Sequence, residues 1–116
     1  AGYSRAVVDG DWIHVSGTTG FDYSDMSIVD DVVQQTHQCF SNISAALAQA
    51  DASLDDVIRV RYLLTDARLF DQVAPVFGQY FARARPAATA MVVGLIDPRM
   101  KIEIEVTARY GASSEA

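Results

Sequence analysis

The chain has 116 residues, of which 50% are hydrophobic and 21% charged, so it can build one hydrophobic core and is too short for two. Its net charge of −6 repels a phosphate backbone unless basic residues cluster on one face, which argues against a nucleic-acid partner. The single Cys39 cannot form an internal disulfide, no apolar run approaches the roughly 20 residues of a membrane span, and residues 1–10 lack the regions of a signal peptide. We therefore expect one soluble, cytoplasmic domain over residues 1–116, with no membrane partner.

The N-terminal part of the sequence predicts a β-hairpin followed by a loop. Residues 6–8 and 12–15 are β-rich runs, and Asp-Gly in the intervening segment 9–11 is a favoured pair for a tight hairpin turn. Residues 16–27 are rich in Gly, Thr, Asp and Ser, which predicts a loop containing no more than a short strand.

The middle of the chain predicts a helix and an interior strand. Apolar residues recur every three or four positions over 30–50, which indicates an amphipathic helix of about five turns. Asp30 and Asp31 suit its N-terminus, where the helix dipole favours negative charge. Residues 57–64 are β-branched and largely apolar, as is typical of a buried strand.

The C-terminal half predicts a second helix and two more strands. Asp66 can cap a helix with an aromatic face, which either kinks at Pro75 or begins near Ala74, because proline lacks an amide donor. Residues 89–93 and 100–109 predict two strands joined by a turn.

The predicted order ββ-α-β-α-ββ indicates an α+β fold in which two helices cover one face of a mixed sheet of four to six strands. In the last strand, apolar positions beginning at Ile102 alternate with polar positions beginning at Glu103, so one face goes to the helices. Trp12, His14 and Ser16 share the other side of their strand, which therefore mixes aromatic and polar groups. Such a face suggests burial against another subunit, and we expect an oligomer.

Seven short segments resemble signatures of the RidA (YjgF/UK) family, in the order and spacing of that family. They are Gly2-Tyr3-Ser4-x-Ala6-Val7, Val15-Ser16-Gly17, Leu54-Asp55-Asp56-Val57, Leu64-Thr65-Asp66, Tyr80-Phe81, Arg85-Pro86-Ala87 and Ile102-Glu103-Ile104-Glu105. The resemblance covers residues 2–109. It implies a chorismate mutase-like fold and a homotrimer, with the sheets in a central barrel, the helices outside and three clefts between subunits.

The resemblance also implies a reaction and its site residues. Deaminating members of the family hydrolyse 2-aminoacrylate and related imines without a metal or organic cofactor, so we expect no cofactor here. An arginine grips the substrate carboxylate, and a carboxyl group positions or activates the attacking water. Matching the motifs assigns the carboxyl group to Glu103 and the cleft to Tyr3, Ser16, Gly17, Thr18, Ala88 and Thr89.

The position expected to carry the arginine is Ala88. Alanine supplies neither charge nor hydrogen bonds, and the loss of a charge-assisted pair costs several kcal/mol in a dry site. Ala88 therefore argues against the usual reaction of the family. Arg5, Arg85 and Arg99 are the candidate substitute anion anchors, although each is more simply explained as a surface or interface residue.

Other sequence patterns that could indicate a catalytic or metal site are less specific than the family motifs. Glu103 and Glu105 would lie about 7 Å apart on one strand face, as in an acid/base pair, but Arg59 and Arg61 alternate in the same way and favour ion pairs across the sheet. A structural role is therefore the better interpretation of Glu105.

His37 and Cys39 are two residues apart and fall on different sides of a helix, which disfavours a zinc site. Cys39 falls beside the apolar stripe of its helix, which favours a buried thiol over a redox sensor. Ser16 lacks the elbow motif of a nucleophile, and the glycines of 17–20 lack the Lys-Ser/Thr of a phosphate-binding loop.

Three functional hypotheses remain. The first is a RidA-like homotrimer whose clefts bind a small metabolite, with or without hydrolysis through Glu103. The second is an enamine/imine deaminase of the 2-iminobutanoate/2-iminopropanoate type with a substitute anion anchor, and the third is a non-enzymatic trimeric interaction protein. Ribonuclease activity ranks last because the chain is acidic.

Overall fold

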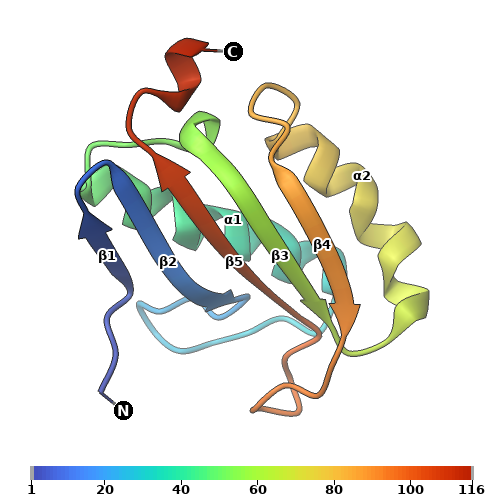
Figure 1. Ribbon diagram of the computed structural model, residues 1–116. Coiled ribbons are helices and arrows are strands. Elements are labelled where there is room, and N and C mark those ends of the chain that lie inside the picture. Colours follow the sequence, from blue (N-terminus) through green and yellow to red (C-terminus); the bar gives the residue numbers. More distant parts are fainter. Residues whose placement is uncertain (1, 116) are drawn as a thin grey trace.

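The computed structural model describes residues 2–115 and places two helices on one face of a five-stranded sheet (Figure 1). The strands are β1 (Ala6–Asp9), β2 (Trp12–Thr19), β3 (Val57–Leu64), β4 (Ala87–Val92) and β5 (Ile102–Arg109). The helices are α1 (Val32–Gln49) and α2 (Phe70–Tyr80), and short 3₁₀ turns occur at Leu54–Asp56, Ala67–Leu69 and Ala112–Glu115. The predicted α+β order is confirmed.

The strands lie in the order β1-β2-β5-β3-β4, and all neighbours are antiparallel except the parallel pair β3–β4. The sheet is therefore mixed, as expected, and β3 is an interior strand. The last two strands of the chain are not neighbours, because β5 lies between β2 and β3 while β4 forms the edge (Figure 1). The connection between them crosses the end of β3 instead of closing a hairpin.

The prediction of a loop from residue 16 onward is wrong for its first four residues, because β2 continues to Thr19. The pairing of β2 with β5 shifts register between Val15 and Thr18, so Ser16 and Gly17 occupy a bulge. A bulge adds a residue to one strand and re-aims the side chains around it. Its glycine and its polar residues account for the loop-like sequence.

Both helices begin differently from the prediction. Asp31 caps α1 by accepting a hydrogen bond from the Gln34 amide at 2.9 Å, so the helix starts at Val32 rather than at residue 30. Asp66 is also a cap, but of the 3₁₀ turn that precedes α2. The predicted start near Ala74 is wrong, because α2 already begins at Phe70 and runs through Pro75.

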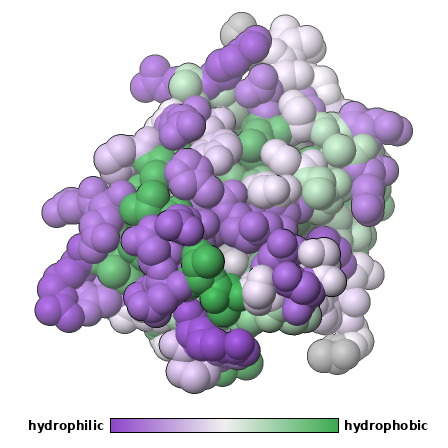
Figure 2. All heavy atoms as spheres, turned by 180° about the vertical axis from the view of Figure 1, so that it is seen from behind, coloured by the Kyte–Doolittle hydropathy of each residue, from purple (hydrophilic) through white to green (hydrophobic). Residues whose placement is uncertain are grey.

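The core lies between the sheet and the helices. The inward positions of β5 are Ile102, Ile104, Val106 and Ala108, and each is at most 3% exposed, which confirms the predicted alternation. Phe40 of α1 is fully buried and stacks on Tyr80 with ring centroids 4.2 Å apart, while Phe77 and Phe81 meet it edge-on. Cys39 is also buried. The outer surface of the helix layer is mostly hydrophilic (Figure 2).

Among residues 2–115, neither helix combines the length and the apolar composition needed to cross a bilayer.

Candidate functional site

Glu103 lies on the sheet face that the helices leave open, where it pairs with Thr19 of β2 and Leu63 of β3. Its carboxyl group presses against the bulge: a Cβ built at Gly17 would lie 2.8 Å from the Glu103 carboxyl carbon and closer still to Oε1. A side chain at position 17 would displace the Glu103 carboxyl group, so Gly17 allows the carboxyl group to lie against the backbone of the bulge.

The carboxyl group of Glu103 has a raised pKa, first because it is partly buried and second because the Glu105 carboxylate is near. Glu105 itself forms an ion pair with Arg61, whose Nε lies 2.9 Å away. This pair agrees with the structural role predicted for Glu105. Arg59 instead donates a hydrogen bond to the Thr89 hydroxyl at 2.7 Å, across the same open face.

The other residues predicted to form a cleft around Glu103 differ in position and in exposure. Ser16 lies in the bulge, and both its amide and its hydroxyl donate to the Arg5 carbonyl at 2.9 Å. Tyr3 is 70% exposed in the segment before β1. Thr18 is fully buried and its hydroxyl bonds the Ser16 carbonyl, so its side chain supports the bulge and does not face a ligand.

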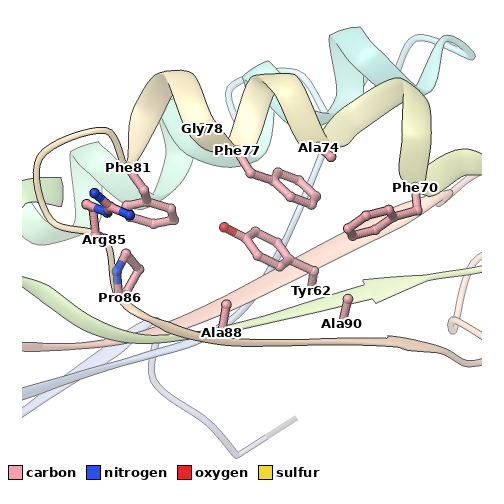
Figure 3. A pocket seen from close by; sticks show the side chains of 10 residues that line it. All are labelled: Tyr62, Phe70, Ala74, Phe77, Gly78, Phe81, Arg85, Pro86, Ala88 and Ala90. Atoms are coloured by element: carbon pink, nitrogen blue, oxygen red, sulfur yellow. The ribbon is translucent and has the colours of Figure 1, made fainter.

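Ala88 lies on the opposite side of the sheet from Glu103. It pairs in parallel register with Val60, a fully buried residue that faces the helices. Ala88 therefore borders a cavity of about 570 Å³ between α2, β3 and β4 (Figure 3). Within one chain, this cavity beside Ala88 does not contain Glu103.

The three candidate anchors occupy different places. Arg85 lines the same cavity as Ala88. Arg5 stacks over the Tyr23 ring at 4.0 Å, and Arg99 forms an ion pair with Asp97 at 2.8 Å. Of the three, only Arg85 is next to the position from which the arginine is missing.

Sequence reasoning missed two polar side chains at these sites. Tyr62 of β3 lines the cavity beside Ala88, and Gln35 of α1 is fully buried and bonded to the segment that leads into β5. Tyr62 follows Arg61 in a largely apolar strand, where an aromatic residue is usual, so no local pattern marks it as functional. Within residues 2–115, no group of three or more His, Cys, Asp or Glu side chains could hold a metal ion.

Glu103→Gln is expected to raise the melting temperature more at pH 7 than at pH 4. The folded pKa of Glu103 lies above its unfolded value, so its contribution to stability is complete below the unfolded pKa and is lost as pH rises through the folded pKa. Glutamine does not ionise and escapes this loss. Thermal unfolding of both proteins from pH 4 to pH 8 checks the prediction, and a difference that is the same at every pH contradicts it. Asp71→Asn, at an exposed position on the first turn of α2, is the control for loss of one negative charge.

Comparison with known proteins identifies the family. The family model described as Endoribonuclease L-PSP matches residues 1–110. The chain is 32% identical over 115 residues to the 2-iminobutanoate/2-iminopropanoate deaminase of Capra hircus, covering 98% of this chain and 84% of the goat protein.

Solved structures of the same family also match this chain. A member of the YjgF/YER057c/UK114 family from Mycobacterium tuberculosis is 38% identical with a TM-score of 0.85, covering 94% of this chain and 87% of that one. RidA from an Antarctic Psychrobacter species is 32% identical with a TM-score of 0.88, covering 94% and 89%. These matches also fit the chorismate mutase-like fold that the resemblance implied. The chain belongs to the RidA (YjgF/YER057c/UK114) family.

Proposed function

We propose that the protein is a homotrimer whose intersubunit clefts bind a small metabolite, and that Glu103 hydrolyses an imine-like compound there without the usual arginine. The observation that carries this proposal is the partly buried Glu103 carboxyl group, held against Gly17 on the open sheet face with a raised pKa. A carboxyl group in such surroundings is a candidate acid or base. The buried free thiol of Cys39 fits a reducing compartment, and we propose the cytoplasm.

The placement of the two halves of the site supports an assembly. Glu103 faces the open side of the sheet and Ala88 faces the helix side, so the two positions cannot serve one ligand within a single chain. They can do so if the edge strand β4 of one subunit lies against the open face of another. The Arg59, Arg61 and Glu105 side chains on that face would then be covered by the neighbouring subunit.

The chemistry required of Glu103 is modest. Water adds to the carbon of a C=N bond, the nitrogen takes up protons, and the adduct collapses to a carbonyl compound and ammonia. Glu103 accepts a proton from the attacking water and returns it to the leaving nitrogen. A raised pKa suits both steps, because it brings the carboxyl group closer to the pH at which it must give and take a proton.

A second candidate function is an ordinary 2-iminobutanoate/2-iminopropanoate deaminase in which Arg85 replaces the missing anchor. The goat relative is named for this activity, and Arg85 lines the same cavity as Ala88. Rapid turnover of 2-aminoacrylate by the unaltered protein would favour this candidate. A trimer that neither turns over imines nor binds small molecules would be a non-enzymatic interaction protein.

The proposal is tested by a solution mass and by an assay with freshly generated 2-aminoacrylate. We expect a trimer, with slow turnover above the buffer control. Glu103→Gln should lower that turnover by about 100-fold, the smaller end of what general acid–base catalysis contributes. A monomer, or turnover unaffected by Glu103→Gln, would contradict the proposal. The exposed Asp71→Asn, on the first turn of α2, is the control for loss of one negative charge.

A further inference from the structure

The cavity beside Ala88 is a groove between α2 and the edge of the sheet, and most of its lining is apolar (Figure 3). Its walls are Tyr62, Phe70, Ala74, Phe77, Gly78, Phe81, Arg85, Pro86, Ala88 and Ala90. Its volume of about 570 Å³ lies in the range of small-molecule sites. Two alanines form its β4 side. Of its aromatic residues, Phe70 is 41% exposed, whereas Tyr62 and Phe77 stack on each other and are mostly buried.

Tyr62 brings a hydroxyl group into this apolar space. The residue is only 5% exposed, and within residues 2–115 its hydroxyl makes no hydrogen bond. The hydroxyl oxygen itself is open to solvent, because no fully buried side-chain oxygen in this part of the chain lacks a partner. Figure 3 shows the oxygen inside the groove, on the side toward Phe81 and Arg85. Burial raises the pKa of this phenol, so it stays protonated and can donate. A hydroxyl group that opens into the groove without a partner in the described part of the chain is free to donate to a ligand.

Arg85 supplies a positive charge at one end of the groove. Its φ of +46° is left-handed, a conformation that is unfavourable for arginine, and its amide donates to the Phe81 carbonyl at 3.0 Å. No acidic side chain among residues 2–115 forms an ion pair with it, whereas Arg83 pairs with Asp55 at 3.7 Å. The strained turn after α2 therefore holds an unpaired guanidinium beside the groove.

We propose that this groove binds a small carboxylic acid with an apolar, preferably aromatic, side chain. The carboxylate lies between the Arg85 guanidinium and the Tyr62 hydroxyl, and the side chain lies against Phe70, Phe77 and the alanines of β4. Bulk at position 88 would fill the floor of the groove, so Ala88 makes room for this ligand. The inference deepens the proposed function by naming the class of ligand. It rests on the proposed function only for the hydrolysis that follows binding.

Calorimetric titration of the full chain tests the inference with three probes: 3-phenylpropanoate, butanoate and 3-phenylpropan-1-ol. We expect 3-phenylpropanoate to bind at least tenfold more tightly than either of the others, since butanoate lacks the ring and the alcohol lacks the charge. Arg85→Gln should weaken its binding about tenfold through loss of a charge-assisted contact. The nearby Arg83→Gln removes the same charge outside the groove and should leave binding unchanged.

Two further variants separate binding from folding. Tyr62→Phe should weaken binding severalfold while leaving the melting temperature unchanged or higher, because the hydroxyl has no hydrogen bond to lose among the described residues. Ala88→Leu should abolish binding of 3-phenylpropanoate by filling the groove, and Ala90→Leu repeats this test at a second position. Circular dichroism shows which variants are folded and can be compared.

Three outcomes would overturn the inference: no binding of 3-phenylpropanoate at millimolar concentration, equal affinity for the alcohol, or equal losses in Arg85→Gln and Arg83→Gln. Titration requires no turnover, so an inactive protein that binds the acid as described would support the groove and count against the hydrolase. Turnover of 2-aminoacrylate without binding of 3-phenylpropanoate would contradict the inference and remain consistent with the proposed function.

Discussion

Ala88→Arg is expected to raise kcat/KM for 2-aminoacrylate by about 100-fold. A guanidinium at this position can hold the substrate carboxylate through two parallel hydrogen bonds, and such a charge-assisted contact contributes about 3 kcal/mol in a desolvated site. Each 1.36 kcal/mol corresponds to roughly a tenfold change in rate, which gives the expected factor. The measurement compares initial rates of the variant and the unaltered protein in an assay that generates the imine in place.

The variant Ala88→Gln is the matched control, because it extends a polar side chain from the same position without the charge. Its kcat/KM for 2-aminoacrylate should rise only slightly. In the double variant Ala88→Arg/Glu103→Gln, the gain should vanish if the two residues serve one ligand. An equal gain with glutamine, or a gain that persists without the Glu103 carboxyl group, would contradict the prediction.

The same substitution should reduce binding of 3-phenylpropanoate, because an arginine at position 88 fills the β4 side of the groove. The side chain at position 88 thus has opposite effects on turnover of 2-aminoacrylate and on binding of 3-phenylpropanoate. A small side chain admits a bulky ligand and leaves Arg85 as the nearest anchor, whereas an arginine favours a small ligand held close to β4.

Local periodicity predicted the elements of the fold well. The three- and four-residue spacing of apolar side chains defined α1 to within two residues, and alternation in β5 assigned its inward face correctly. Both patterns are properties of neighbouring residues in the chain, so a sequence displays them directly. The same local patterns predicted the order of strands and helices, and the family resemblance added the chorismate mutase-like fold.

Features set by contacts between distant segments were not predictable in this way. The end of β2 resembles a loop in sequence, because glycine and serine weaken a strand, yet Gly17 lies in a strand, where the Glu103 carboxyl group packs against it. The position of β5 between β2 and β3 likewise depends on pairing across the chain. Pro75 was expected either to kink the second helix or to delay its start to about Ala74, but α2 begins at Phe70 and runs through Pro75.

Motif matching proposed candidate site residues but not their arrangement in space. For Glu103 and Ala88, the side of the sheet that each faces depends on register with β3, which the sequence does not display. The same is true of Tyr62, which looks like an ordinary core aromatic in the sequence although its hydroxyl points into the groove beside Ala88. The strand pairing is what places Glu103 and Ala88 on opposite faces of the sheet.

Gln35→Leu is expected to lower the free energy of unfolding by about 3–5 kcal/mol. Gln35 is fully buried in α1, and its side-chain amide donates to the carbonyls of Val29 and Arg99 while its oxygen accepts from the Lys101 amide, all at 2.9 Å. Leucine has a similar volume but leaves three backbone groups without partners, and each such group costs about 1–3 kcal/mol when it stays buried. Urea denaturation measures the loss.

The neighbouring Gln34→Leu is the control, since this side chain is exposed and the change should stay within about 0.5 kcal/mol. The effect of Gln35→Leu should reach the site as well, because Lys101 is two residues before Glu103 and leads into β5. A variant that still folds should therefore lose imine turnover out of proportion to its residual stability. A Gln35→Leu protein as stable as Gln34→Leu would show that the three backbone groups find water or new partners when the amide is removed, and that the start of β5 does not depend on α1 for its position.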